Sequence, residues 1–303
     1  MASYERFYDP KILARVGRLE LRAKMIVEGI ITGMHKSPYH GQSVEFIDHR
    51  AYVPGDDPRH IDWKVLGRAD RIVLKRFEEE TNLRGHLLLD SSESMRYGAT
   101  AWSKYEYGGT LAASIAYLLQ RQHDAVGLTL FDSEVRSRIP PSTHQAMLLR
   151  IGEVMAEAVP RGKTGLGRVL EEIAESIPRR GLVALISDLF APVEEIAAGL
   201  QAFALRGHDL LVFHVLDETE LSFPFEGNTL FHGLEEYPDL LADPRALREG
   251  YLEALHAYLG KVEKTCSLLG IDYLRTHTAE PLDAAIVSVI SARSRTRRRY
   301  RKS

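Results

Sequence analysis

The sequence predicts an α/β protein: a doubly wound, mainly parallel sheet with helices on both faces, preceded by an N-terminal helix and strand extension. Two observations lead to this prediction. From residue 85 onward, short apolar runs alternate with amphipathic segments of helical length, which is typical of parallel strands joined by crossover helices. Two of the apolar runs also end in an aspartate, which would place both carboxylates at the sheet edge where such folds bind ligands.

The individual elements follow from hydrophobic periodicity. Short apolar runs predict strands at residues 86–89, 126–131, 135–139, 182–187, 210–216 and 271–275. Apolar residues at helical spacing predict helices at residues 105–121, 145–158, 166–177, 196–203, 247–269 and 282–290. Right-handed crossovers are expected between the parallel strands.

We divide the chain into three parts. Residues 1–84 hold a predicted helix at 12–34 and a block with strand-like runs at 41–52 and 71–77, and residues 85–292 form the α/β domain. Residues 217–246 interrupt its strand–helix rhythm, either as a hairpin packed on the domain or as an interaction loop. Residues 293–303 form a basic tail, which we interpret as a solvated end rather than a nucleic-acid site.

Composition indicates a globular, cytoplasmic protein. The 303 residues carry a formal charge of -3, which gives no general attraction to nucleic acid or to anionic membranes. No apolar run approaches the length of a membrane span, and the first ten residues lack a secretion signal. The single cysteine, Cys266, excludes an internal disulfide; it lies on the apolar stripe of the predicted helix 247–269, so we interpret it as structural rather than nucleophilic.

The most informative stretch begins at Asp90, directly after the predicted strand 86–89. We expect the chain to stay extended for a few residues, so that Asp90, Ser92 and Ser94 point to the same side. One carboxylate and two hydroxyls are hard oxygen donors, suited to a divalent cation such as Mg²⁺. Glu93 should point away from them into solvent.

Two further segments should reach the same edge. The run 182–187 is followed by Asp188, and residues 161–165 place the hydroxyl of Thr164 on a glycine-flanked loop that opens a helix. The sequence Gly162-Lys163-Thr164 looks like the end of a phosphate-binding P-loop. That motif requires a glycine where this chain has Glu157, and a preceding strand where it has a helical pattern, so we reject nucleotide binding here.

The pattern Asp-x-Ser-x-Ser-Met at residues 90–95 resembles the metal-ion-dependent adhesion site of von Willebrand factor A domains. The resemblance implies Asp90, Ser92 and Ser94 as ligands from a first loop, Thr164 from a second and Asp188 from a third. It implies Mg²⁺, or another divalent cation such as Mn²⁺ or Ca²⁺, as the cofactor. It also implies that a carboxylate from a partner protein completes the coordination, so that the metal forms a bridge.

A longer resemblance covers the N-terminal block. The block is similar to the bacterial family called domain of unknown function 58, through Arg50, Tyr52, Gly55, Asp56, Asp57, Arg59, Ile61, Asp62 and Trp63. The resemblance implies a MoxR-type AAA+ ATPase as partner, with the pair assembling or activating an unidentified client protein in the manner of a chaperone. The residues themselves suggest a structural clamp, with a partner-docking surface as the alternative.

Three functions therefore remain open. The first is a non-catalytic, metal-dependent protein-interaction module. The second is a metal-dependent hydrolase of the phosphoesterase kind using Asp90 and Asp188, which would also need a general base and a substrate-binding cation such as Lys163. The third and weakest is nucleic-acid binding through the arginine-rich tail.

Overall fold

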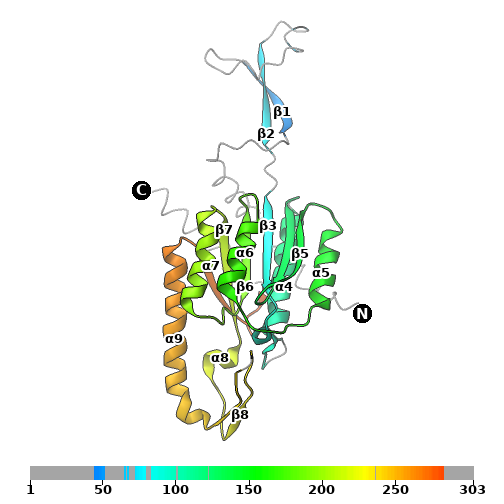
Figure 1. The fold of residues 1–303 in the computed structure, drawn as a ribbon. Helices are drawn as coiled ribbons and strands as arrows, with labels where there is room; N and C mark the ends of the chain where they lie inside the picture. Colours follow the sequence, from blue (N-terminus) through cyan, green and yellow to red (C-terminus); the bar gives the residue numbers. More distant parts are fainter. Residues whose placement is uncertain are drawn as a thin grey trace. The chain divides into compact units, whose positions relative to one another are not determined.

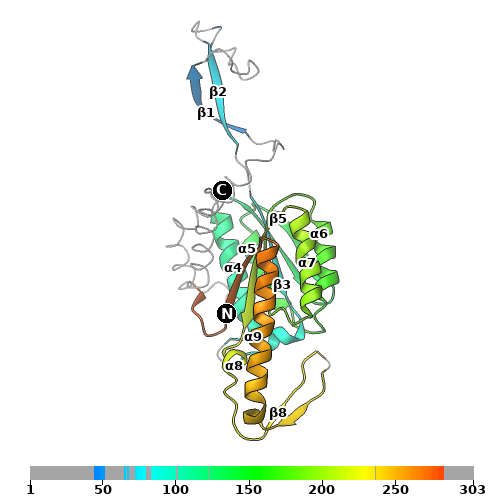
Figure 2. The ribbon, with the colours of Figure 1, turned by 90° about the vertical axis from the view of Figure 1, so that its left-hand side faces the viewer.

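The computed structural model describes residues 44–51, 65, 67, 72–79, 83–99, 102–121, 123–235 and 237–282 (Figure 1 and Figure 2). Its contacts divide the chain into two compact units, one within residues 31–82 and one that contains everything described from Leu83 onward. The predicted helix 12–34, the matching block from Tyr52 to Trp63, nearly all of the predicted helix 282–290 and the basic tail lie outside the described residues.

The smaller unit contains an antiparallel pair of strands. Strand β1, Val44–Ala51, pairs with β2, Val73–Glu79, in a register that sets Val44 opposite Glu79. The register shifts between Phe46 and Asp48, which marks a bulge in β1. The two strand-like runs predicted in the N-terminal block are therefore confirmed.

The larger unit is built on a six-stranded sheet of order β10-β7-β6-β3-β4-β5. All neighbouring strands are parallel except the β4–β5 pair, which is antiparallel. The strand bounds are β3 Arg84–Asp90, β4 Ala125–Phe131, β5 Val135–Ser142, β6 Leu182–Ser187, β7 Asp209–Leu216 and β10 Asp272–His277. Strands β3, β4 and β6 are almost wholly buried, as strands covered on both faces must be.

Helices cover both faces of this sheet (Figure 2). Buried residues of α6 and α7 form one apolar cluster with the sheet and with Val262 and Cys266 of α9, whereas α4 and α5 contact each other and the other side of the sheet. The helix bounds are α4 Lys104–Arg121, α5 Met147–Glu157, α6 Leu166–Ser176, α7 Val193–Leu205 and α9 Pro244–Leu268. The predicted α/β, mainly parallel, doubly wound fold is confirmed.

Cys266 is fully buried in the cluster shared by α6, α7 and α9. Burial raises the pKa of its thiol to about 12, so the thiolate is not formed at neutral pH. The structural interpretation of this cysteine is confirmed.

The segment between β7 and α9 forms a short helix and a hairpin. Helix α8, Glu218–Ser222, is followed by β8, Thr229–Phe231, and by its antiparallel partner β9, Leu240–Ala242. Phe223 packs on Tyr251 of α9 with 4.5 Å between ring centroids, and stacks with Phe231. The aromatic residues of this insertion thus pack on the domain. Among the described helices, none combines the length and the hydropathy that crossing a bilayer would require.

His86 of β3 should give the folded protein a marked acid sensitivity. Burial, with smaller contributions from His208 and nearby arginines, lowers its pKa to about 4, below the ordinary value of 6.5. Between pH 6.5 and 4 the unfolded chain therefore takes up a proton that the folded chain does not. The contribution of neutral His86 to the free energy of unfolding is fully present above pH 6.5. It falls by up to about 3 kcal/mol as the pH drops to 4.

The substitution His86→Leu should flatten the pH profile of the free energy of unfolding, measured by urea titration at several pH values. Part of the slope should remain, because burial also lowers the pKa of His214 to about 4. An unchanged slope in His86→Leu would contradict the assignment.

Candidate functional site

Asp90 is the last residue of β3 and is fully buried. The parallel pairing of β3 with β6 places it beside Ser187, whose hydroxyl donates to Asp90 Oδ2 at 2.5 Å. The backbone N–H of Ser92 donates to Asp90 Oδ1 at 2.9 Å. Burial, reinforced by the nearby Asp188 carboxylate, raises the pKa of Asp90 above its ordinary value. The structure thus holds this carboxylate in one orientation, in an environment that favours a neutralising partner.

The chain after Asp90 is not extended as expected. Residues Glu93–Arg96 form a 3₁₀ helix, η3, because the N–H of Met95 bonds to the carbonyl of Ser92 at 3.2 Å. The two serine side chains nevertheless meet, with 3.0 Å between Ser92 Oγ and Ser94 Oγ, and both are buried. The expected backbone was wrong, but a tight turn brings the same oxygens together.

The loop that carries Thr164 is fastened to this first loop by two backbone hydrogen bonds. The N–H of Arg161 donates to the carbonyl of Ser91 at 2.9 Å, and the N–H of Glu93 donates to the carbonyl of Gly162 at 3.0 Å. Gly162 has φ +77°, a conformation that favours glycine. Helix α5, not a strand, precedes this loop, in agreement with the rejection of a P-loop.

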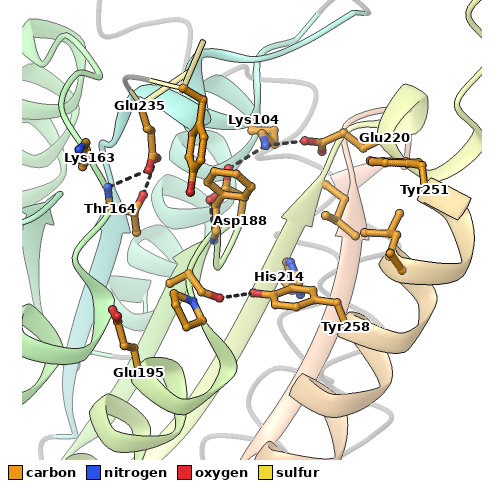
Figure 3. Close-up of a pocket in the computed structure, with 17 residues that line it drawn as sticks. Lys104, Lys163, Thr164, Asp188, Glu195, His214, Glu220, Glu235, Tyr251 and Tyr258 are labelled. Atoms are coloured by element: carbon orange, nitrogen blue, oxygen red, sulfur yellow. Dashed lines mark hydrogen bonds and ion pairs between the residues drawn. The ribbon is translucent and has the colours of Figure 1, made fainter. Parts of the chain in front are cut away.

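Asp188 follows β6 and forms a buried ion pair. Its Oδ2 lies 2.7 Å from Nζ of Lys104, the first residue of α4, and the same ammonium lies 2.9 Å from Glu220 Oε1 (Figure 3). Burial alone would lower the pKa of Lys104, but the two carboxylates outweigh it and raise the pKa, so the lysine stays charged. Asp188 therefore reaches the predicted edge, with its charge balanced by a lysine of the same chain.

The backbone after Asp188 is strained and held from several sides. Leu189 is buried with φ 51°, a left-handed conformation that is unfavourable for a side chain of this size. The N–H of Leu189 donates to Ser187 Oγ at 2.9 Å. The hydroxyl of Tyr258 in α9 donates to the carbonyl of Ala191 at 3.0 Å and also to the carbonyl of Leu189. Strain of this kind is maintained at functional sites by the surrounding structure.

Removing the Tyr258 hydroxyl should loosen this loop. The substitution Tyr258→Phe deletes the hydrogen bonds to Leu189 and Ala191 and should lower the free energy of unfolding by about 1–2 kcal/mol. Urea unfolding measures the loss, and hydrogen exchange should show it at residues 188–191. A change of stability without faster exchange in this loop would contradict the proposed role.

Thr164 does not point its hydroxyl at the two serines. Thr164 Oγ1 donates to Glu235 Oε1 at 2.7 Å, and Thr164 N donates to Glu235 Oε2 at 3.1 Å. Glu93 is also not the solvated side chain that the sequence suggested, because its Oε2 accepts the N–H of Glu235 at 3.1 Å. Both departures have one cause: the turn between β8 and β9 reaches over this edge of the sheet.

A cavity of about 710 Å³ opens beside these residues (Figure 3). Polar groups line one part of it, whereas aromatic and aliphatic side chains line the rest, including Phe190, Tyr237, Tyr251, Leu255 and Tyr258. Pockets that combine an apolar wall with a few polar groups are typical of ligand sites.

The donor set of the first loop fits a hard divalent cation. Within the described residues, no group of three or more histidine, cysteine, aspartate or glutamate side chains could hold a metal. A site here would thus depend on the hydroxyls of Ser92 and Ser94 beside the Asp90 carboxylate, all oxygen donors of the kind that Mg²⁺ prefers. The oxygens of Thr164 and Asp188 reach the same edge but are engaged by Glu235 and Lys104.

Comparisons with known proteins give a family and distant structural similarities. The family described as "Protein of unknown function DUF58" matches residues 48–258. The chain is 29% identical to the uncharacterized protein Rv1480 of Mycobacterium tuberculosis over 293 residues, which cover 95% of this chain and 91% of that protein. The crystal structure of BatB from Bacteroides thetaiotaomicron matches 70% of this chain and 99% of its own, with a TM-score of 0.47 and 18% identity.

The von Willebrand A domain of SpRpn10 matches 68% of this chain and 94% of its own, with a TM-score of 0.39 and 11% identity. Similarities of this size carry neither a function nor a site across to this chain.

Proposed function

We propose that this chain, which belongs to the DUF58 family, is a non-catalytic protein-interaction module that binds its partner through a divalent cation at the edge of its sheet. One observation carries the proposal. The carboxylate of Asp90 and the hydroxyls of Ser92 and Ser94 are buried together at the end of β3, with the two hydroxyls 3.0 Å apart. Buried polar groups are costly unless they form hydrogen bonds or coordinate a metal. This set of oxygens has the chemistry of a magnesium site.

We assign Asp90, Ser92 and Ser94 as the inner ligands. Thr164 and Asp188 would join them once Glu235 and Lys104 release their oxygens. When bound, the cation would supply a positive charge to which a carboxylate of the partner can bind. The residues of this chain hold the site in place, because Ser187 and the Ser92 N–H fix Asp90 and two backbone bonds fasten the Thr164 loop to it.

The ion pair of Asp188 favours interaction over hydrolysis. Of the two carboxylates at this edge, Asp188 has its charge balanced by Lys104 at 2.7 Å, so it adds little net negative charge to the site. The other proposed ligands include three neutral hydroxyls, from Ser92, Ser94 and Thr164, which would leave the cation electrophilic towards an incoming carboxylate. A site of this composition suits a bridge between proteins.

The family resemblance supplies the proposed partner. We propose a MoxR-type AAA+ ATPase, which would act together with this chain in the cytoplasm to assemble or activate a client protein. In this arrangement the metal edge contacts a carboxylate of the ATPase or of the client.

Metal binding and partner binding test the proposal in sequence. Electron paramagnetic resonance of Mn²⁺ should detect a site in the full chain that weakens at least about tenfold in Asp90→Asn and in the double variant Ser92→Ala/Ser94→Ala. Asp124→Asn is the matched control, because Asp124 is also buried but precedes β4 at the opposite edge of the sheet. Equal Mn²⁺ affinity in all four proteins would contradict the metal site.

The partner is then tested with a purified MoxR-type ATPase from the same organism. Sedimentation should show a complex in Mg²⁺ that dissociates in EDTA and does not form with Asp90→Asn. A complex that forms equally under all three conditions would remove the metal from the interface. Turnover of p-nitrophenyl phosphate that is lost in Asp188→Ala would instead support the hydrolase alternative.

A further inference from the structure

The turn between β8 and β9 places a glutamate on the candidate site. Glu235 is only 6% exposed, although it belongs to a short hairpin. Its two carboxylate oxygens accept from the hydroxyl and the N–H of Thr164, at 2.7 and 3.1 Å (Figure 3). Its own N–H donates to Glu93 Oε2. A single residue therefore bonds to both the first and the second loop of the proposed metal site.

The conformation of Glu235 has an energetic cost. Its φ of 54° lies in the left-handed region, which costs a residue with a side chain about 1 kcal/mol or more. Glutamate is also among the residues least often buried. The hydrogen bonds to Thr164 and Glu93 offset this cost and fasten the turn to both loops of the candidate site.

The cavity continues from this carboxylate along an apolar wall. Glu235 and Thr164 line one part, and Tyr237, two residues further along the chain, lines it as well. The ring of Tyr237 packs edge to face against that of Phe190, with centroids 6.1 Å apart. Tyr237 is otherwise open to solvent and is 64% exposed. The turn thus presents an acidic side chain and an aromatic one to the same cavity.

We propose that Glu235 is an internal ligand that occupies the docking position of the partner's carboxylate. The partner is then an acidic segment that displaces the turn, places its carboxylate on the Thr164 loop and seats an aromatic or aliphatic side chain in the cavity beside Phe190 and Tyr258. This inference rests on the proposed function, since the partner carboxylate that displaces Glu235 is the one that we propose binds the cation.

The chain itself supplies the probe: a fluorescently labelled peptide of residues 229–242, added in Mg²⁺ to the full-length protein. It should bind Glu235→Gln at least tenfold more tightly than the wild type, because the substitution keeps the size of the side chain and removes its charge. Glu226→Gln is the matched control, since that glutamate lies in the same insertion but is exposed. A peptide with both Glu235 and Glu236 replaced by glutamine should not bind any of these proteins.

Hydrogen exchange provides a second measurement on Glu235→Ala. The amides of residues 229–242 should exchange at least tenfold faster than in the wild type, while those of β3 and β6 stay protected. If the peptide binds wild type and Glu235→Gln equally, or if exchange in the hairpin is unchanged in Glu235→Ala, the internal ligand is overturned.

Mn²⁺ binding, measured on the same samples, separates this inference from the proposed function. If Mn²⁺ binding depends on Asp90 but the peptide binds the wild type and Glu235→Gln equally, the metal site stands and the internal ligand is overturned. Preferential peptide binding to Glu235→Gln without any Mn²⁺ site supports a carboxylate-docking loop and overturns the metal bridge.

Discussion

Replacing Lys104 by methionine should lower the free energy of unfolding by about 3–5 kcal/mol in metal-free buffer. Lys104 is 3% exposed, and its ammonium lies between Asp188 and Glu220, at 2.7 and 2.9 Å. Methionine fills the volume of the stem but leaves two carboxylates without a counter-charge, one of them fully enclosed. Urea unfolding in EDTA measures the loss.

The same variant should respond to a divalent cation more strongly than the wild type. In the wild type the lysine already balances Asp188, so it competes with a metal for that carboxylate. In Lys104→Met, Mg²⁺ can take over this role, and the melting temperature should rise with Mg²⁺ concentration by more than in the wild type. Mn²⁺ affinity should increase at least about tenfold, equivalent to 1.4 kcal/mol.

Two further variants make this result specific. Lys264→Met removes an exposed lysine of α9 and should change neither stability nor metal response. Lys104→Met combined with Asp188→Asn removes one of the two unbalanced carboxylates, so it should recover part of the stability and lose the gain in Mn²⁺ affinity. If Mg²⁺ stabilises Lys104→Met no more than the wild type, the metal does not reach Asp188.

Local patterns in the sequence were sufficient for the sheet and for the first loop. Strands β3 and β6 are buried on both faces, so they appear as continuous apolar runs, and Asp90 and Asp188 stand out where those runs end. The meeting of Ser92 and Ser94 was predicted for the wrong reason, because a 3₁₀ turn rather than an extended strand brings them together. The turn that begins at Ser92 sets the two hydroxyls 3.0 Å apart, close enough for one ion to contact both.

The residues that modify the site could not be predicted in the same way. Lys104 pairs with a residue 84 positions later, and Glu235 bonds to one 71 positions earlier, and no periodicity relates positions so far apart. Their pairing depends on how the insertion folds back over the sheet edge. Glu93 was misread because alternation was assumed to continue past Asp90, where the chain in fact turns.

Asp217 is a different case, since a local signal was present and would have identified it. The spacing Asp217-x-x-Glu220 after an apolar strand is a capping-box pattern. The structure contains that box at the start of α8, where Glu220 also accepts the N–H of Asp217 and bonds to Lys104. The cap therefore orients one of the two carboxylates that hold the buried lysine.

The substitution Asp217→Ala should cost about 3–4 kcal/mol of unfolding free energy, more than a helix cap alone. Besides the N–H and hydroxyl of Thr219, its fully buried carboxylate accepts from the N–H of Ala99 at 3.2 Å and the hydroxyl of Thr278 at 2.7 Å. Burial alone would raise the pKa of Asp217, but these hydrogen bonds outweigh it and lower the pKa. Alanine leaves donors from three separate segments without an acceptor.

Asp243→Ala provides the comparison, because Asp243 is also an N-cap aspartate, at the start of α9, but it is exposed and accepts from the N–H of Arg245. Its loss should cost about 1 kcal/mol, the ordinary value for a cap. In Asp217→Ala, hydrogen exchange should also accelerate at residues 97–99 and 276–278, which no helix cap would influence. Equal costs for the two variants would mean that Asp217 only caps α8, and that the loops around Lys104 are held together by other contacts.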